Sequence, residues 1–194
     1  MTLSPRFLEA LGFAAELHLD QKRKGTDIPY LSHILAVASI VMEHGGTEDE
    51  VIAALLHDAV EDRGGRPMLE QIRQRFGDSV AGIVEGCTDA FVEPKPPWKP
   101  RKEAYLAHLR DPKTSPSVRL VSAADKLHNA RAIQRDYRQL GEPLWSRFTG
   151  AREGTLWYYG AVVDALKAAG STPLLQELEE VVREIQSLAA AAAG

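Results

Sequence analysis

The chain has 194 residues, which is long enough to bury one sizeable core and short for two ordinary domains, so we expect a single domain over residues 1–194. With 44% hydrophobic and 26% charged residues, the composition is typical of globular proteins and excludes a disordered, collagenous or membrane-embedded chain. The net charge of -4 excludes a general attraction to nucleic acids or anionic membranes, so an anionic ligand needs a local group of basic residues.

Cysteine content bears on the compartment and on the partners. The single cysteine, Cys87, cannot form an internal disulfide, and no basic start followed by a long apolar run marks a signal peptide. We therefore expect a protein of the reducing cytoplasm with no nucleic-acid partner and no membrane partner. The sequence leaves the oligomeric state open, a homo-oligomer included.

Apolar residues recur at helical spacing along the chain, and no alternating strand pattern is found. Thr47 with Glu50 is typical of a helix start, Gly77 of a helix end, and Pro173 of the first turn of a last helix. The expected helices cover residues 5–24, 32–44, 47–60, 68–76, 79–87, 101–110, 117–138, 150–169 and 173 onward, with a fraying tail at 189–194. The proline-rich stretch 94–100 is expected to be a loop. The sequence thus predicts an all-α helical bundle.

A histidine and an aspartate stand together at the end of an apolar run, in Leu55-Leu56-His57-Asp58. Burying an unpaired carboxylate is costly, and a metal ion can pair its charge and fix the imidazole tautomer. His33 and Asp125 stand at the polar ends of similar apolar stretches. We therefore expect a metal site between helices with His33, His57, Asp58 and Asp125 as ligands.

Two imidazoles and two carboxylates suit a borderline divalent metal such as Mn, Fe or Zn, and they leave coordination positions open for water and substrate. Each residue also has a simpler interpretation. A buried histidine is often a hydrogen-bonded core residue, and Asp125 can pair with Lys126 or Arg131. The occurrence of all four candidate ligands in one chain favours a metal site over these simpler interpretations.

The order H…HD…D resembles the motif of the HD phosphohydrolases. Five segments resemble the hydrolase domain of RelA/SpoT proteins and the stand-alone small alarmone hydrolases, the metazoan SpoT homologues among them, over about residues 7–165: Arg23–Thr26, Pro29–His33, His57–Asp62, Phe76–Gly77 and Ala124–Arg131. The resemblance implies an HD fold, a bound Mn²⁺ and removal of the 3′-pyrophosphate from guanosine tetra- or pentaphosphate. One departure is Ile34, where the family usually has proline, and its effect on activity stays open.

Glu61 and Asp62 follow His57-Asp58 by one helical turn, so they can face the metal. Carboxylates near a helix C-terminus oppose the helix dipole, which favours a functional role over a simple polar helix end. We expect both to be catalytic, orienting or deprotonating the attacking water or passing a proton to the leaving group.

Four residues are expected to bind substrate: Arg23, Lys24, Asn129 and Arg152. The basic run before Gly25 can be a solvated surface cluster, but a guanidinium can also stack on a purine and pair with phosphate. Asn129 follows Asp125 by one turn, and an amide can read a base edge or a ribose hydroxyl. The resemblance implies substrate contact for Arg23, Lys24 and Asn129. The remaining histidines are expected at surface or helix-end positions without chemistry: His18, His44, His108 and His128.

The leading interpretation is a Mn-dependent pyrophosphohydrolase of the guanosine-3′,5′-bis(diphosphate) 3′-diphosphatase type, whose partner is a small purine nucleotide. A second is a nucleotide phosphatase or phosphodiesterase acting on another nucleotide, adenine alarmones included, because the HD scaffold itself does not choose the ester. A third is an alarmone-binding sensor with weak turnover. The sequence does not separate guanine from adenine alarmones or identify the native metal.

Overall fold

The computed structural model describes residues 2–92 and 94–192. The helices are α1 (Pro5–Leu17), α2 (Leu31–Glu43), α3 (Glu48–Leu56), α4 (Ala59–Arg63), α5 (Gly65–Phe76), α6 (Asp78–Cys87), α7 (Trp98–Arg110), α8 (Pro116–Leu140), the 3-10 helix η1 (Glu142–Arg147), α9 (Ala151–Lys167) and α10 (Pro173–Ala191). Within these two ranges there is no strand, and Lys22 and Pro29 form an isolated bridge. The predicted all-α fold is confirmed.

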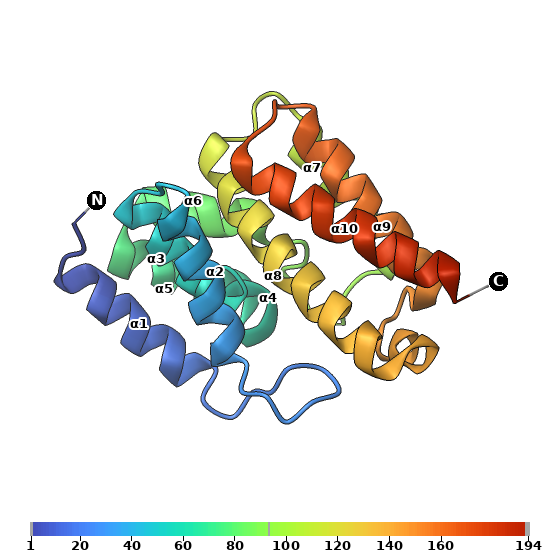
Figure 1. The fold of residues 1–194 in the computed structure, drawn as a ribbon. Helices are drawn as coiled ribbons and strands as arrows, with labels where there is room; N and C mark the ends of the chain where they lie inside the picture. Colours follow the sequence, from blue (N-terminus) through green and yellow to red (C-terminus); the bar gives the residue numbers. More distant parts are fainter. Residues whose placement is uncertain (1, 93, 193–194) are drawn as a thin grey trace.

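The longest helix, α8, organises the molecule. Figure 1 shows it crossing the middle, with α1–α6 on one side and α9 and α10 on the other, and it packs against α2, α3, α6 and α10. Ser115 caps its start by accepting a hydrogen bond from the Val118 amide at 3.2 Å, and Pro116 needs no amide donor in the first turn. Most of its inward side chains are apolar, so Asp125 in its centre is an exception.

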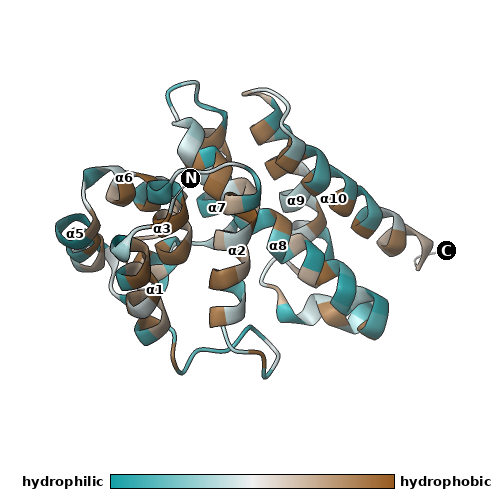
Figure 2. Cartoon of the chain, turned by 60° about the vertical axis from the view of Figure 1, so that its left-hand side comes forward, coloured by the Kyte–Doolittle hydropathy of each residue, from teal (hydrophilic) through white to brown (hydrophobic). Residues whose placement is uncertain are grey.

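The helix α3 forms the inner part of the first group. Thr47 and Glu50 make the predicted capping box, and every residue from Val51 to Leu56 is buried. A helix that is apolar all round belongs in the centre of a fold. In Figure 2, apolar residues are concentrated where α1, α2 and α3 meet, whereas the outer turns of α8 are largely hydrophilic.

Several predicted boundaries are wrong, and the start of α5 at Gly65 rather than residue 68 is one of them. The first helix ends at Leu17 instead of residue 24, since the chain turns away to form the loop that carries the isolated bridge. The helix expected over 47–60 is broken, because His57 and Asp58 form a turn between α3 and α4. The helix α7 begins at Trp98 inside the proline-rich stretch, because Pro100 lies in its first turn, where no amide hydrogen bond is lost.

The start of the last helix was predicted correctly, but its end was not. It begins at Pro173, after Thr172 accepts a hydrogen bond from the Leu175 amide, and residues 189–191 lie inside it rather than in a frayed tail. Residues 193–194 lie outside the described part of the chain. None of the helices in 2–92 and 94–192 has the length and apolar character to cross a bilayer.

Candidate metal centre and active site

Three parts of the fold bring the four predicted ligands together. His33 lies in the first turn of α2, His57 and Asp58 form the turn between α3 and α4, and Asp125 lies in the middle of α8. Neighbouring residues on a straight helix point about 100° apart, following the 3.6-residue turn. The break after Leu56 instead lets His57 and Asp58 face the same space.

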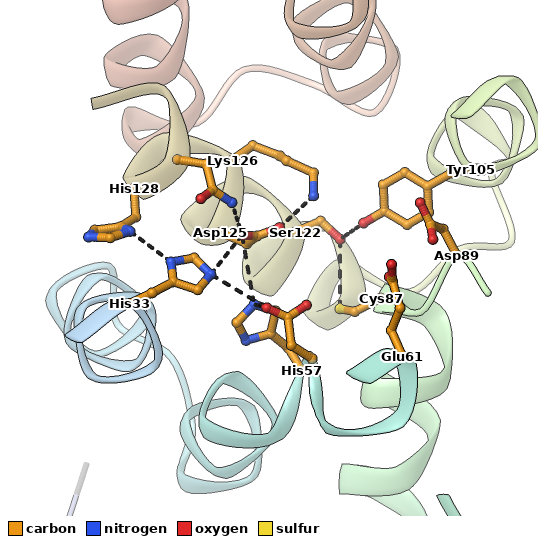
Figure 3. Close-up of polar contacts among 12 residues, drawn as sticks. His33, His57, Glu61, Cys87, Asp89, Tyr105, Ser122, Asp125, Lys126 and His128 are labelled. Atoms are coloured by element: carbon orange, nitrogen blue, oxygen red, sulfur yellow. Dashed lines mark hydrogen bonds and ion pairs between the residues drawn. The ribbon is translucent and has the colours of Figure 1, made fainter. Parts of the chain in front are cut away.

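The polar atoms of these side chains lie within ion-pair distance of one another. His33 Nε2 is 3.6 Å from Asp58 Oδ2 and 3.2 Å from Asp125 Oδ1. His57 Nε2 is 3.0 Å from Asp58 Oδ2 and 3.7 Å from Asp125 Oδ1. Figure 3 shows both imidazoles turned toward the Asp125 carboxylate, and both rings are buried. The predicted convergence of these residues is therefore present.

The hydrogen bonds of the two histidines show which ring nitrogen of each faces the carboxylates. His57 Nδ1 lies 2.8 Å from the Ala54 carbonyl oxygen, and a carbonyl can only accept, so Nδ1 carries a proton and Nε2 is the ring nitrogen that faces the carboxylates. His33 Nδ1 lies 2.7 Å from His128 Nδ1 and donates to it in the matching tautomer. Both Nε2 atoms are buried without a hydrogen-bond partner among the described residues. Imidazole nitrogens that face carboxylates at this depth need a proton or a metal cation between them.

The ionisation of the group fits the same conclusion. Burial alone would raise the pKa of Asp58 and Asp125, but the neighbouring histidines, and Lys126 beside Asp125, hold both pKa values well below the usual range. Burial works against a charged His57, yet the two carboxylates raise its pKa well above the ordinary value. The two ionised carboxylates therefore favour positive charge at the imidazole nitrogens that face them, as a proton or as a metal cation. Ligand atoms of His33, His57 and Asp58 lie within 4.8 Å of one another, which suits a divalent metal.

Several side chains hold the candidate ligands in place, as outer groups do in metal sites. The Tyr30 hydroxyl donates to Asp58 Oδ2, and Lys126 Nζ and Asn129 Nδ2 each lie 2.5 Å from an Asp125 oxygen. His128, predicted to have no chemistry, contacts His33 instead. The sequence feature that could have predicted this contact is the position of His128 three residues after Asp125, which places it on the adjoining face of α8. His18, expected at the surface or at a helix end, is the C-terminal cap of α1 and is buried.

The two predicted catalytic acids lie on α4, and both are near Lys95, whose Nζ is 3.5 Å from Asp62 Oδ1. Glu61 Oε1 lies 2.9 Å from Lys95 Nζ and 3.5 Å from Arg101 Nη1. Burial, and then the charges of Asp89 and Asp58, raise the pKa of Glu61 to about 7. Asp62 Oδ2 accepts a hydrogen bond from Gln21 Nε2 at 2.8 Å. Glu61 thus combines partial burial with a pKa suited to proton transfer near neutral pH.

A cavity of about 170 Å³ adjoins the metal centre and contains three of the predicted substrate-binding residues. Arg23 Nη2 donates to Asn129 Oδ1 at 2.8 Å, and Asn129 also donates to Asp125, so the amide joins the cavity to a candidate ligand. Lys24 and Tyr30 line the same cavity. Basic, aromatic and amide groups in one cavity can receive a base and phosphates.

Arg152 does not reach this cavity. Its Nη2 donates to the Ala189 carbonyl at 2.8 Å and its Nε is 3.6 Å from Glu142, so it joins α9 to α10 and η1. Arg135 and Arg147 line the cavity instead. Arg147 was missed because nothing in its local sequence predicts that η1 folds back over the loop at Gly25, where an added Cβ would lie 2.8 Å from Arg147 Cδ.

This helical fold, with a histidine, a histidine–aspartate pair and a second aspartate around one space, defines an HD domain. The family model described as an HD domain matches residues 10–156, and the chain belongs to that family. Similar proteins narrow the class of HD domain further. They confirm the predicted resemblance to RelA/SpoT hydrolase domains and small alarmone hydrolases.

Two of the relatives with matching sequences carry the same name. The guanosine-3′,5′-bis(diphosphate) 3′-pyrophosphohydrolase MESH1 of Xenopus tropicalis is 43% identical over 131 residues, which are 66% of this chain and 69% of that protein. The MESH1 protein of Mus musculus is 40% identical over 133 residues, 67% of this chain and 70% of that protein. A solved structure described as a metazoan ortholog of SpoT that hydrolyzes ppGpp has a TM-score of 0.77 and 29% identity, and covers 95% of this chain and 97% of that chain.

Proposed function

We propose that this protein hydrolyses guanosine 3′,5′-bis(diphosphate), ppGpp, and its 5′-triphosphate form to GDP or GTP and pyrophosphate. The observation that carries the proposal is the pair of buried His33 and His57 Nε2 atoms that lack partners and face two carboxylates. The names of the relatives supply the substrate. The compartment we propose is the cytoplasm, in keeping with a single free cysteine.

The metal we propose is Mn²⁺, held by His33, His57, Asp58 and Asp125. Mixed imidazole and carboxylate ligands support a borderline divalent ion, and Fe²⁺ or Zn²⁺ would meet the same ligand chemistry. When bound, such an ion polarises phosphoryl oxygen and makes water more acidic.

Glu61 is the group that we propose as general base. In the proposed reaction a water oxygen forms a bond to the phosphorus attached to the ribose 3′-oxygen, and the bond between that oxygen and phosphorus breaks. Glu61 takes the water proton, and the ribose oxygen gains a proton as it leaves. A pKa of about 7 lets Glu61 accept a proton at neutral pH and return it. Asp62, fixed by Gln21, orients the water.

Arg23, Lys24 and Asn129 would bind the rest of the nucleotide. The Arg23 guanidinium can stack on the purine or pair with phosphate, and Lys24 supplies a point charge in the same cavity. The cavity's positive side chains compensate locally for the net charge of -4. We propose no nucleic-acid or membrane partner.

Pyrophosphate release is the direct test. The purified protein is incubated with Mn²⁺ and ppGpp, the corresponding adenine alarmone or ordinary nucleotides, with an EDTA-treated sample as control. Selective, metal-dependent release of pyrophosphate and GDP from ppGpp is expected. Turnover of another nucleotide alone, or binding of ppGpp without turnover, would contradict the proposal and favour another HD phosphatase or a sensor.

A further inference from the structure

A second buried charged cluster lies beside the metal centre, and its central residue, Asp89, has no role in the sequence-based account. Asp89 follows α6, and its side chain is 5% exposed. Figure 3 shows the carboxyl groups of Glu61 and Asp89 directed into the same space from two different segments. A carboxylate at this depth needs compensating partners.

The partners of Asp89 are two basic residues of α7. Arg101 Nη1 donates to Asp89 Oδ1, and Lys102 Nζ donates to Asp89 Oδ2 at 2.6 Å. The two basic side chains are 11% and 17% exposed, so they too are largely removed from water. Asp89 thereby fixes the positions of two long cationic side chains. Its contacts offset the conformational entropy that these side chains lose on being ordered.

Arg101 connects this cluster to the proposed base. The same Nη1 atom that binds Asp89 lies 3.5 Å from Glu61 Oε1, and Lys95 Nζ lies 2.9 Å from that oxygen. The cluster therefore brings three cations to two carboxyl groups, and it places positive charge on the Glu61 side of the site.

We propose that Asp89 is a positioning residue for the hydrolysis: it holds Arg101 and Lys102 so that Glu61 keeps a fixed orientation and the departing pyrophosphate meets cations already in place. This inference rests on the proposed function. Preorganised charges cost no reorganisation during the reaction, which is why their placement affects kcat more than KM.

The ionisation of the pair supports this geometry. Burial alone would raise the pKa of Asp89, but Lys102, a hydrogen bond from Glu61 and Arg101 lower it to about 2. Asp89 thus stays ionised and favours the protonated form of Glu61. The other groups around Glu61 act in both directions: Asp58 raises its pKa, Lys95 lowers it, and Arg101 adds a nearby positive charge.

The test compares Asp89→Asn, Arg101→Gln and the double variant with the intact protein. Asn keeps the size of Asp but removes the charge. We expect Asp89→Asn to lower kcat about 10- to 100-fold with little change in KM, bound metal or melting temperature. Because Asp89 acts through Arg101, the double variant should lose little more than either single variant. Glu179→Gln on α10, which removes the carboxylate that binds Lys167, is the matched control and should leave kcat unchanged.

Two readouts separate positioning from mere support of the fold. The acid limb of the kcat profile should move to lower pH in Asp89→Asn, because the negative charge that favours protonated Glu61 is gone. Carbon NMR titration of the Glu61 carboxyl should show the same shift in metal-free protein, and this arm decides the proposal even if the intact protein does not hydrolyse ppGpp. An unchanged Glu61 titration, or a loss of activity matched by loss of metal or of folded protein, would overturn it.

Discussion

Two nitrogen atoms define the chemistry at the scale of single residues. His33 Nε2 and His57 Nε2 are buried and lack hydrogen-bond partners within the described ranges, while their Nδ1 atoms are held by His128 and by a backbone carbonyl. The opposite ring nitrogen of a metal-binding histidine is usually fixed in this way. The contacts of the Nδ1 atoms thus orient both Nε2 atoms toward the carboxylates.

Asp58→Ala should remove tightly bound metal and abolish pyrophosphate release, because Asp58 contacts both imidazoles and receives the Tyr30 hydrogen bond. We expect a loss of activity of at least about 1000-fold, beyond the 10- to 100-fold typical of an outer partner. Metal content by elemental analysis and pyrophosphate release measure the two effects. The control is Asp78→Asn, an exposed carboxylate on α6. Full metal retention and a normal rate in Asp58→Ala would show that the ligand assignment is wrong.

Glu61→Gln should keep the metal and lose most turnover, about 100-fold or more, because it removes a general base without removing a ligand. The dependence of kcat on pH tests whether Glu61 acts in its ionised form. Glu61 has a pKa of about 7 without metal, and a nearby dication lowers it, so kcat should fall tenfold per unit as pH drops below a midpoint at or below 7. A Gln variant with an unchanged kcat and acid limb would exclude Glu61 as the base.

At the scale of helices, the close approach of α6 to α8 fixes where Asp125 lies. A Cβ on Gly86 would lie 2.5 Å from Val118 Cγ2, whereas nothing lies within 4 Å of a Cβ on Gly82 in the same helix. Gly86→Ala should therefore lower the free energy of unfolding by about 1–3 kcal/mol. Gly82→Ala, the matched control, should raise it by about 0.5–1 kcal/mol, because alanine favours helix. Chemical denaturation measures both, and equal effects of the two variants would contradict the packing argument.

Local signals predicted most helix starts but not the break that builds the site. Thr47 with Glu50 and Thr172 with Pro173 mark helix starts through their own hydrogen bonds and backbone geometry. The turn at His57-Asp58 has no glycine or proline, so tertiary contacts of these two side chains decide it. Pro100 led to a wrong start for α7, because a proline is also compatible with the first turn of a helix.

At the scale of the whole molecule, the ligand set could be predicted because its order along the chain resembles a known family. The surroundings could not. His128 acts by a contact from α8 to α2, and Arg147 enters the cavity through the fold-back of η1. Arg152 was placed there on charge alone, whereas its partners lie on α10 and η1. Long-range packing decides which side chains reach the site, and one sequence does not reveal that packing.

Because the site joins α2, the α3–α4 turn and α8, metal binding should stabilise the entire fold. Removal of metal with EDTA should lower the melting temperature, and added Mn²⁺ should restore it in a concentration-dependent way. At a free metal concentration of 100 times Kd the expected stabilisation is about 2.7 kcal/mol. Scanning calorimetry measures this, with Asp58→Ala as the control that should not respond. A melting temperature independent of metal in the intact protein would argue against a site that spans these elements.

The most direct measurement is a titration of Mn²⁺ into metal-free protein while pyrophosphate release from ppGpp is followed. The account predicts no release without metal and a rate that rises with added Mn²⁺ until one ion is bound per chain. Full release of pyrophosphate in the presence of EDTA, or no release of pyrophosphate from ppGpp with the ion bound, would contradict the claim that these four side chains form the centre of a metal-dependent ppGpp hydrolase.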